Sequence, residues 1–345
     1  MLFTSTEFAL LLAITFGLFY TVGSRALQVG VLLIASVVFY AWSSLSLTVL
    51  LLASALTTTT ISYYLLRSND PIIRKKLAVF GVVLNLSVLA FFKYAGLFTY
   101  SIQNLLDREL SGAEWLMMIP LPIGISFYTF QGISMLVDSF RNCSDGELQL
   151  EEGVFFVIFF PQLVAGPVVK AKDFLPQISL KYFSAIRWKV VIHCVITGFF
   201  LKMVVANNLQ NQTFWIQYPQ IIGMTADRCW ILLVGYSCQI YADFAGYSLI
   251  AIGVAALFGY RLPKNFNFPY IATSISDFWR RWHISLSSWL KDYLYIPLGG
   301  NRKGSIRTYV NLLIVMTLGG LWHGAAWSYL IWGAFHGILL AVERA

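Results

Sequence analysis

Long, nearly uncharged apolar segments are the feature that most limits how this chain can fold. Only 12% of its 345 residues are charged, about half the share found in soluble domains. A membrane-crossing helix needs roughly 20 consecutive apolar residues. The sequence therefore predicts an all-α, polytopic membrane protein of about 8–10 helices. The candidate spans are Phe8–Tyr20, Leu27–Tyr40, Leu45–Leu66, Leu77–Tyr94, Ala185–Val205, Ile231–Phe258, Thr308–Leu321 and Ala325–Val342.

Proline and glycine interrupt two shorter apolar segments, Met117–Phe130 and Val154–Ala165. Non-helical backbone at membrane depth is tolerated only where it is buried in protein or lines a wet cavity. We therefore expect broken or re-entrant helices here. The whole chain, 1–345, is predicted to be one transmembrane domain, in which 1–116 forms bracing helices and 117–345 encloses a cavity.

The segment Ile231–Phe258 is longer than a membrane requires. At 1.5 Å per residue it measures about 42 Å, against a hydrocarbon core of about 30 Å. It must tilt strongly or break, and Gly246 and Gly253 are the candidate break points. Asp243 lies near its middle, where an acid either orients a histidine, pairs with an arginine or enters a structural ion pair.

The basic residues predict the orientation. Arg67, Arg74, Lys75 and Lys76 surround the connection between the third and fourth spans, which places that connection in the cytoplasm. Counting back places Arg25 inside and the N-terminus outside. Because no basic residue precedes the first apolar run, it is expected to be a retained helix and not a cleaved signal peptide. The net charge of +8 suits anionic membrane lipid, and no extended basic surface indicates a nucleic-acid partner.

One polar and aromatic stretch, DFWRRWHISLSSWLKDYLYIPLGG, stands out between Asp277 and Gly300. Ser274 is a suitable helix cap before it, and Asp277 and Arg281 are spaced to form an ion pair. Plotted as one helix, it has an aromatic and apolar face (Trp279, His283, Leu286, Leu290, Leu294) and a polar, mainly cationic face (Arg280, Ser287, Lys291). This pattern predicts an amphipathic helix lying along the membrane interface. His283, on the apolar face, either packs in the core or faces the cavity.

Four histidines occur, His193, His283, His323 and His336. His323 lies in LGGLWHGAAW, inside an apolar run, where an ionisable residue is a functional hypothesis by default. A neutral imidazole there suits a general base; the alternative is a structural histidine bonded to a backbone carbonyl. His336 follows 13 positions later, about 19.5 Å away on a straight helix. The two cannot pair directly unless that helix breaks.

Several familiar kinds of site have no motif here. The four cysteines form no C-x-x-C pair, so no metal site or bound cofactor is expected. There is no Walker A motif, no H-E-x-x-H and no G-x-S-x-G elbow, so a covalent acyl-enzyme is not indicated. Gln162 is expected to bond backbone freed by Pro161. A lone buried histidine fits direct transfer, in which it removes a proton from an acceptor hydroxyl that attacks an activated acyl group.

Five motifs in a fixed order, from Pro120 to the end of the chain, resemble the membrane-bound O-acyltransferase family, in its bacterial alginate O-acetyltransferase-like branch. They are PLPIGISFYTFQGISMLVDSFR, FFPQLVAGPVVKA, YADFAGYSLIAIG, SISDFWRRWHISLSSWLKDYLYIPLGGNRKG and LGGLWHGAAWSYLIWGAFHG. The resemblance implies helices around a tunnel that runs from the cytoplasm to the outer face. His323 would be the catalytic histidine and His283 the second histidine, at the cytoplasmic mouth. Relatives usually continue past Ala345 with further helices, so the chain is expected to be C-terminally short.

The resemblance also implies the substrates and partners. Acetyl-CoA or another acyl thioester would be the donor, and an extracytoplasmic polysaccharide such as alginate the acceptor. A periplasmic acetyltransferase is the expected partner. The expected location of this protein is the bacterial inner membrane. Candidate substrate-binding residues are Asp243, Arg280, Trp279, Trp322 and Gln162. A transporter and a non-catalytic scaffold for the partner remain the alternatives; the absence of an internal repeat argues against the first.

Overall fold

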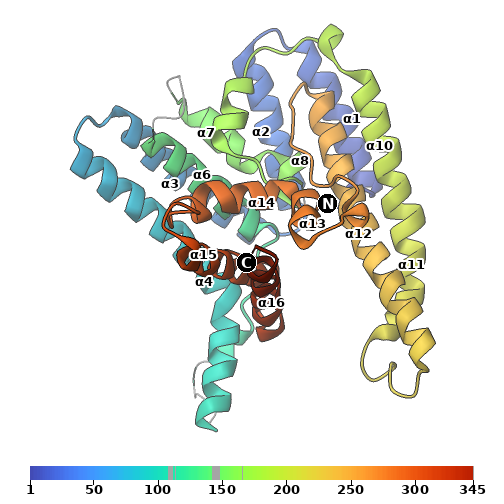
Figure 1. Cartoon of the computed structure of the whole chain (residues 1–345). Helices are drawn as coiled ribbons and strands as arrows, with labels where there is room; N and C mark the ends of the chain where they lie inside the picture. Colours follow the sequence, from blue (N-terminus) through green and yellow to red (C-terminus); the bar gives the residue numbers. More distant parts are fainter. Residues whose placement is uncertain (108–111, 113, 142–147, 165, 345) are drawn as a thin grey trace. The chain divides into compact units, whose positions relative to one another are not determined.

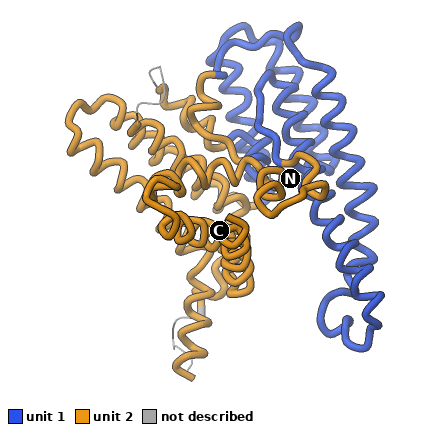
Figure 2. Tube along the Cα trace, viewed as in Figure 1, with its two compact units in different colours: residues 1–43, 159–167, 177–265 blue, residues 44–158, 168–176, 266–345 orange. Residues whose placement is uncertain are grey.

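The computed structural model describes residues 1–107, 112, 114–141, 148–164 and 166–344 (Figure 1). All regular secondary structure among these residues is helical, which confirms the predicted all-α class. Two compact units are present, 1–43 with 159–167 and 177–265, and 44–158 with 168–176 and 266–345 (Figure 2). Ala165 and Ala345 lie outside the described residues. The single domain divided near residue 116 stays a prediction.

The first unit contains the two N-terminal helices and a long helical pair. Serine side chains begin α1 and α2, since Ser5 and Ser24 accept hydrogen bonds from Phe8 N and Leu27 N at 3.2 Å each. Such caps satisfy amide groups that have no partner inside the helix. Its helices are α1 (Thr6–Thr21), α2 (Arg25–Ala41), α8 (Phe160–Leu163), α10 (Trp188–Phe199), a π-helical turn (Phe200–Ala206), α11 (Asn207–Thr213) and α12 (Ala226–Leu257).

The helix α12 runs unbroken for 32 residues. Of the two expected outcomes, a break at Gly246 or Gly253 does not occur, and a strong tilt stays a prediction. These glycines instead permit close packing against α10 and the π-helical turn that follows it. A Cβ at Gly246 would stand 2.8 Å from the carbonyl oxygen of Gly198, and one at Gly253 would stand 2.8 Å from a methyl of Val195. Glycine lets two backbones approach in a way that any side chain would prevent.

The second unit contains the longest helix and the C-terminal elements. Ser44 caps α3, and the Asp70 carboxylate accepts from Ile72 N at 2.7 Å just ahead of Pro71, the favoured first residue of a helix. Its helices are α3 (Leu45–Arg67), α4 (Pro71–Leu106), α5 (Glu114–Met117), α6 (Ile125–Phe140), α7 (Leu150–Ile158), α9 (Ala171–Phe174), α13 (Ile275–Arg281), α14 (Ile284–Leu290), a π-helical turn (Lys291–Tyr295), α15 (Ser305–His323) and α16 (Trp327–Arg344).

Among the described residues, four helical segments are long and apolar enough to cross a membrane: α3, α4, α12 and the run Trp188–Ile216. The apolar helices α1 and α2 are shorter. The last two predicted spans coincide with α15 and α16, which are not among the four. Many large apolar side chains on the four segments are exposed, for example Val49, Phe80 and Ile231. That exposure suits a lipid environment, where it carries no hydrophobic cost.

Both predicted interruptions are real. The first is irregular backbone with Pro120 and Pro122 between α5 and α6, and α6 begins after Gly124 in the left-handed conformation, at φ 73°. The second lies at Phe159, the single residue between the end of α7 and the start of α8. Proline removes a backbone donor and cannot continue a helix from its N-terminal side. Local chemistry was therefore enough to place these breaks.

Candidate active site

A tight helical hairpin places His323 at the end of α15, beside the start of α16 (Figure 1). Close approach depends on glycines: a Cβ at Gly320 would collide with the carbonyl oxygen of Tyr329, and one at Gly333 with that of Met316. The glycines around His323 thus let another stretch of backbone come close. His323 itself is exposed, so its imidazole is open to a reacting molecule.

His283 is the second histidine of the site, and its backbone is unusual. It connects α13 to α14 with φ 45° and ψ 52°, a left-handed conformation that costs a non-glycine residue about 1–2 kcal/mol. Its side chain is only 1% exposed. The imidazole ring lies 6.0 Å from that of His323, measured between centroids. The structure thus brings together the two histidines proposed for catalysis, 40 positions apart in sequence.

This geometry corrects the prediction of one continuous interfacial helix after Ser274. The cap is confirmed, since Ser274 Oγ accepts from Asp277 N at 3.1 Å, and the Asp277–Arg281 ion pair is confirmed at 2.8 Å. The helix nevertheless ends at Arg281, and α14 is largely buried, with Leu286, Trp289 and Leu290 in a core cluster. The shared face drawn on a single helix does not exist.

Stacked aromatic rings hold Trp322, the residue before His323. Its ring lies 5.6 Å from that of His283 and 5.6 Å from that of Phe130. Phe130 in turn stacks on Trp289 at 3.9 Å, and the Trp289 indole donates to the Phe130 carbonyl at 3.0 Å. The hydrogen bond of its indole N–H holds Trp289 in place. The candidate residue Trp322 packs against the rings of both histidines, on the side where Phe130 and Trp289 stack.

A second aromatic group reaches His323 from α13 and α16. The Trp332 ring lies 5.6 Å from that of His323 and 4.9 Å from that of His336, and Trp279 packs on His336 at 5.2 Å. The helix break that would let His336 approach His323 does occur, at Gly324–Ala326. Sequence reasoning missed Trp332 and set His336 aside; the signal was the i, i+4 spacing of two rings on one amphipathic helix.

Glu343 links α16 to α13, the helix that carries Trp279 and Arg280. Its carboxylate accepts from Ile275 N at 2.9 Å and from Ser276 N at 2.8 Å. The Ser276 hydroxyl also donates to this carboxylate, and it is the main cause that holds the pKa of Glu343 below its ordinary value, with the Ser276 and Ile275 amides adding to it. An anion at a helix N-terminus satisfies amide donors and suits the helix dipole. Arg280 is exposed on this anchored helix.

Two polar residues of α4 contact the end of α15, and sequence reasoning missed both. Lys93 Nζ donates to the Trp322 carbonyl and to Ser126 Oγ, and Tyr94 OH donates to the Leu321 carbonyl at 2.8 Å. The available signal was a lysine inside the apolar run Leu77–Tyr94, where a charge is rarely placed without a use. These contacts tie the candidate catalytic helix to a membrane-spanning helix of the same unit.

Asp292 lies one helix away from the histidines, on the π-helical turn after α14. Its carboxylate accepts from Lys170 at 2.8 Å and Lys172 at 3.2 Å, and Lys170 also contacts Ser288 Oγ at 2.5 Å. Partial burial alone would raise the pKa of Asp292, but the two ammonium groups outweigh burial and hold it below its ordinary value. The cluster ties α14 and the π-helical turn after it to the start of α9.

Two predicted site residues belong to the first unit. Asp243 on α12 forms an ion pair with Lys202, which is the structural interpretation of this acid. Gln162 on α8 is fully buried beside Pro161, at 0% exposure. Both are described within their own unit. Their role toward the histidines stays a prediction.

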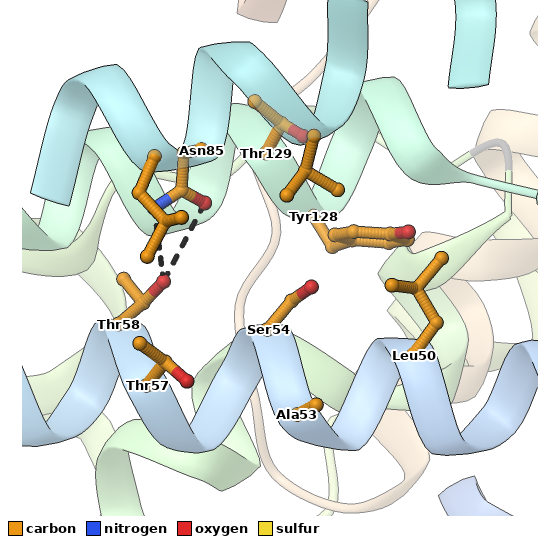
Figure 3. Close-up of a pocket in the computed structure, with 10 residues that line it drawn as sticks. Leu50, Ala53, Ser54, Thr57, Thr58, Asn85, Tyr128 and Thr129 are labelled. Atoms are coloured by element: carbon orange, nitrogen blue, oxygen red, sulfur yellow. Dashed lines mark hydrogen bonds between the residues drawn. The ribbon is translucent and has the colours of Figure 1, made fainter. Parts of the chain in front are cut away.

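A pocket of about 160 Å³ opens between α3, α4 and α6 (Figure 3). Polar side chains line it, among them Ser54, Thr57 and Thr129. The Asn85 amide donates to Thr58 Oγ1 at 3.0 Å and to the Gly81 carbonyl at 2.9 Å, so its polar atoms serve helix packing. None of the candidate site residues lines this pocket.

Comparison with known proteins finds one matching family and several relatives. The sequence pattern of the membrane-bound O-acyltransferase family matches residues 34–345. A probable alginate O-acetylase, AlgI, of Pseudomonas aeruginosa is 42% identical over 100% of this chain and 66% of its own length. A peptidoglycan O-acetyltransferase of Helicobacter pylori is 36% identical, covering 91% of this chain and 64% of its own.

A less similar relative is named for the transfer of D-alanyl groups. A teichoic acid D-alanyltransferase of Bacillus subtilis is 30% identical over 63% of this chain and 58% of its own length. The chain thus spans a little under two thirds of the Pseudomonas aeruginosa relative. The pattern match covers most of the chain and includes His283, Trp322 and His323. This protein belongs to the membrane-bound O-acyltransferase family.

Proposed function

We propose that this protein moves acetyl groups from a cytoplasmic thioester, such as acetyl-CoA, to hydroxyl groups of an extracytoplasmic polysaccharide such as alginate. The observation that carries the proposal is an exposed imidazole, His323, held at a helix end with a second histidine ring 6.0 Å away. The relatives named alginate O-acetylase and peptidoglycan O-acetyltransferase support acetyl transfer to a glycan. A transporter would not need this paired arrangement.

His323 acts as the general base in the proposed reaction. Its neutral imidazole takes the proton of an acceptor hydroxyl while the hydroxyl oxygen attacks the thioester carbonyl carbon. The tetrahedral intermediate then collapses: the carbon–sulfur bond breaks, and the thiolate takes the proton from the imidazolium. The products are an acetyl ester and a free thiol, and the histidine returns to its neutral form.

The other candidate residues have supporting roles in this proposal. His283 orients or activates the donor from its buried position, and Trp279 and Trp322 form apolar walls that exclude water from the thioester. Arg280 is a cation suited to phosphate groups of the donor. Asp243 and Gln162, in the first unit, stay candidate substrate-binding residues. This protein would be a multi-pass protein of the inner membrane. A periplasmic acetyltransferase partner would deliver the acetyl group to the final acceptor.

Acetyl transfer by the full-length protein tests this proposal. Membranes containing it would receive [14C]acetyl-CoA and unacetylated alginate, and incorporation into polymer and into membrane-associated protein would be measured. His323→Ala should lower the rate by about 100- to 10,000-fold, the usual contribution of a general base. His193→Ala is the matched control, because His193 is an exposed histidine of the first unit, and it should retain activity.

Each outcome decides between named alternatives. Equal transfer by wild type and His323→Ala would make the histidine structural and refute the proposed base. Uptake of labelled donor without any transfer would favour a transporter. Recruitment of a periplasmic partner that is independent of both His323 and acetyl transfer would favour a scaffold. A parallel reaction with a D-alanyl thioester and teichoic acid tests the chemistry named for the Bacillus subtilis relative.

A further inference from the structure

Lys93 is a charged residue inside a membrane-spanning helix, and the proposed function has not used it. It lies on α4, the 36-residue apolar helix Pro71–Leu106, and is half-buried. Within the described part of the chain, none of the ion pairs includes Lys93. An ammonium group at membrane depth is costly, and such residues generally mark a functional pathway.

The contacts of Lys93 converge on the backbone that carries His323. Lys93 donates to the Trp322 carbonyl, while Tyr94, the next residue along α4, donates to the Leu321 carbonyl at 2.8 Å. The last carbonyls of a helix have no donor inside it, and they carry partial negative charge. Two consecutive α4 side chains therefore bond two consecutive carbonyls in the final turn of α15. A third contact, to Ser126 Oγ at 3.0 Å, fixes the ammonium group from α6.

We propose that Lys93 is a positioning residue for His323: with Tyr94 it fixes the end of α15, and its positive charge keeps the imidazole in the unprotonated form. This inference deepens the proposed function and rests on it. A general base must be neutral before it can accept a proton. Removal of the imidazole from water is the larger effect that opposes its protonation, and the positive charge of Lys93 adds to it.

The other groups around His323 do not supply such a charge. His283 approaches from the α13–α14 junction, Trp322 precedes His323 on α15, and Trp332 approaches from α16, with His336 behind it. Tryptophan has no ionisable group, and both neighbouring histidines are able to exist as neutral rings. Among these neighbours, Lys93 is the group whose ammonium form contacts the backbone next to His323.

Chemical modification of His323 measures its protonation without requiring acyl transfer. Diethyl pyrocarbonate modifies neutral imidazole, so the modification rate of the full-length protein would be followed by mass spectrometry between pH 4 and 8. The midpoint is the pH at which the modification rate of His323 is half its maximum. In Lys93→Met this midpoint should move to higher pH by about one unit relative to wild type. Lys93→Arg retains the charge and should keep the wild-type midpoint. Equal midpoints in wild type and Lys93→Met would overturn the electrostatic role.

Tyr94→Phe separates fixing of the helix end from the effect of charge. It removes one hydrogen bond to α15 and no charge, so the midpoint should stay while kcat for acetyl transfer falls several-fold at unchanged KM. Lys189→Met, at an exposed lysine of α10, is the matched control and should change neither quantity. Wild-type kcat in Tyr94→Phe would overturn the positioning role.

The His323 midpoint and kcat for acetyl transfer also distinguish failure of this inference from failure of the proposed function. If wild type transfers acetyl groups while Lys93→Met keeps both its midpoint and its kcat, the inference fails and the acyltransferase stands. If wild type transfers nothing, the proposed function fails, and the midpoint alone decides whether Lys93 controls the charge of His323. Should Lys93→Met fail to fold, Lys93→Gln removes the charge while keeping a donor for the Trp322 carbonyl, and a wild-type midpoint for His323 in that variant would overturn the electrostatic role.

Discussion

At the scale of single residues, His283 has two separable roles. Its imidazole stands 6.0 Å from that of His323, and its backbone provides the left-handed junction between α13 and α14. Asparagine adopts the left-handed conformation more readily than most residues, so His283→Asn should keep the fold while removing the imidazole. We expect acetyl transfer to fall at least tenfold, with the unfolding temperature in detergent within a few degrees of wild type.

A β-branched residue at the same position tests the backbone role. His283→Val places a branched side chain at φ 45° and should lower the free energy of unfolding by about 1–2 kcal/mol more than His283→Asn. Thermal unfolding followed by circular dichroism compares the two variants directly. If both are equally stable, the junction is not strained, and the conformation has no energetic consequence.

At the scale of elements, the contacts of Asp292 with Lys170 and Lys172 make the attachment of α14 depend on pH. Because the pKa of Asp292 is lowered in the folded protein, ionisation of Asp292 stabilises the fold above its unfolded pKa of about 3.9. That contribution is lost as the pH falls through the lowered folded value. Asp292→Asn should therefore destabilise the protein at neutral pH by about 1–2 kcal/mol, since one partner of a partly buried pair is removed.

Unfolding measured at several pH values tests this linkage. The difference between wild type and Asp292→Asn should be constant between pH 6 and 8 and should shrink below about pH 4. Asp227→Asn is a matched control, because Asp227 is an exposed carboxylate in the first turn of α12. A difference that persists unchanged into acid would contradict the ionic origin of the stabilisation.

At the scale of the whole molecule, features set by neighbouring residues were predictable from the sequence, and features set by contacts between distant segments were not. Apolar run length and proline placement are local, so the all-α class, most helix positions and the breaks near Pro120 and Pro161 were predictable. The left-handed turn at His283 depends on packing of distant segments, which helical periodicity cannot represent. The contact of Lys93 with the Trp322 carbonyl joins residues 229 apart, and no spacing rule reaches that far.

The membrane orientation is a prediction at this same scale, based on positive charge inside. The Met1 amino group donates to the Phe39 carbonyl at 3.4 Å and to Ser43 Oγ at 3.3 Å. The chain start and the end of α2 therefore lie together, as they would if α1 and α2 each crossed the membrane. Arg67, Arg74, Lys75 and Lys76 flank the next connection, which places residues 68–70 in the cytoplasm and Ser43 outside.

Single cysteines in a cysteine-free background test this orientation with a membrane-impermeant maleimide on cells whose outer membrane has been permeabilised. Ser43→Cys should react in such cells, whereas Gly23→Cys and Ser68→Cys should react only after the inner membrane is disrupted. Labelling of Gly23→Cys together with Ser43→Cys would mean that the short helices α1 and α2 do not cross. Labelling of Ser68→Cys without Ser43→Cys would show the opposite orientation and contradict the prediction based on positive charge.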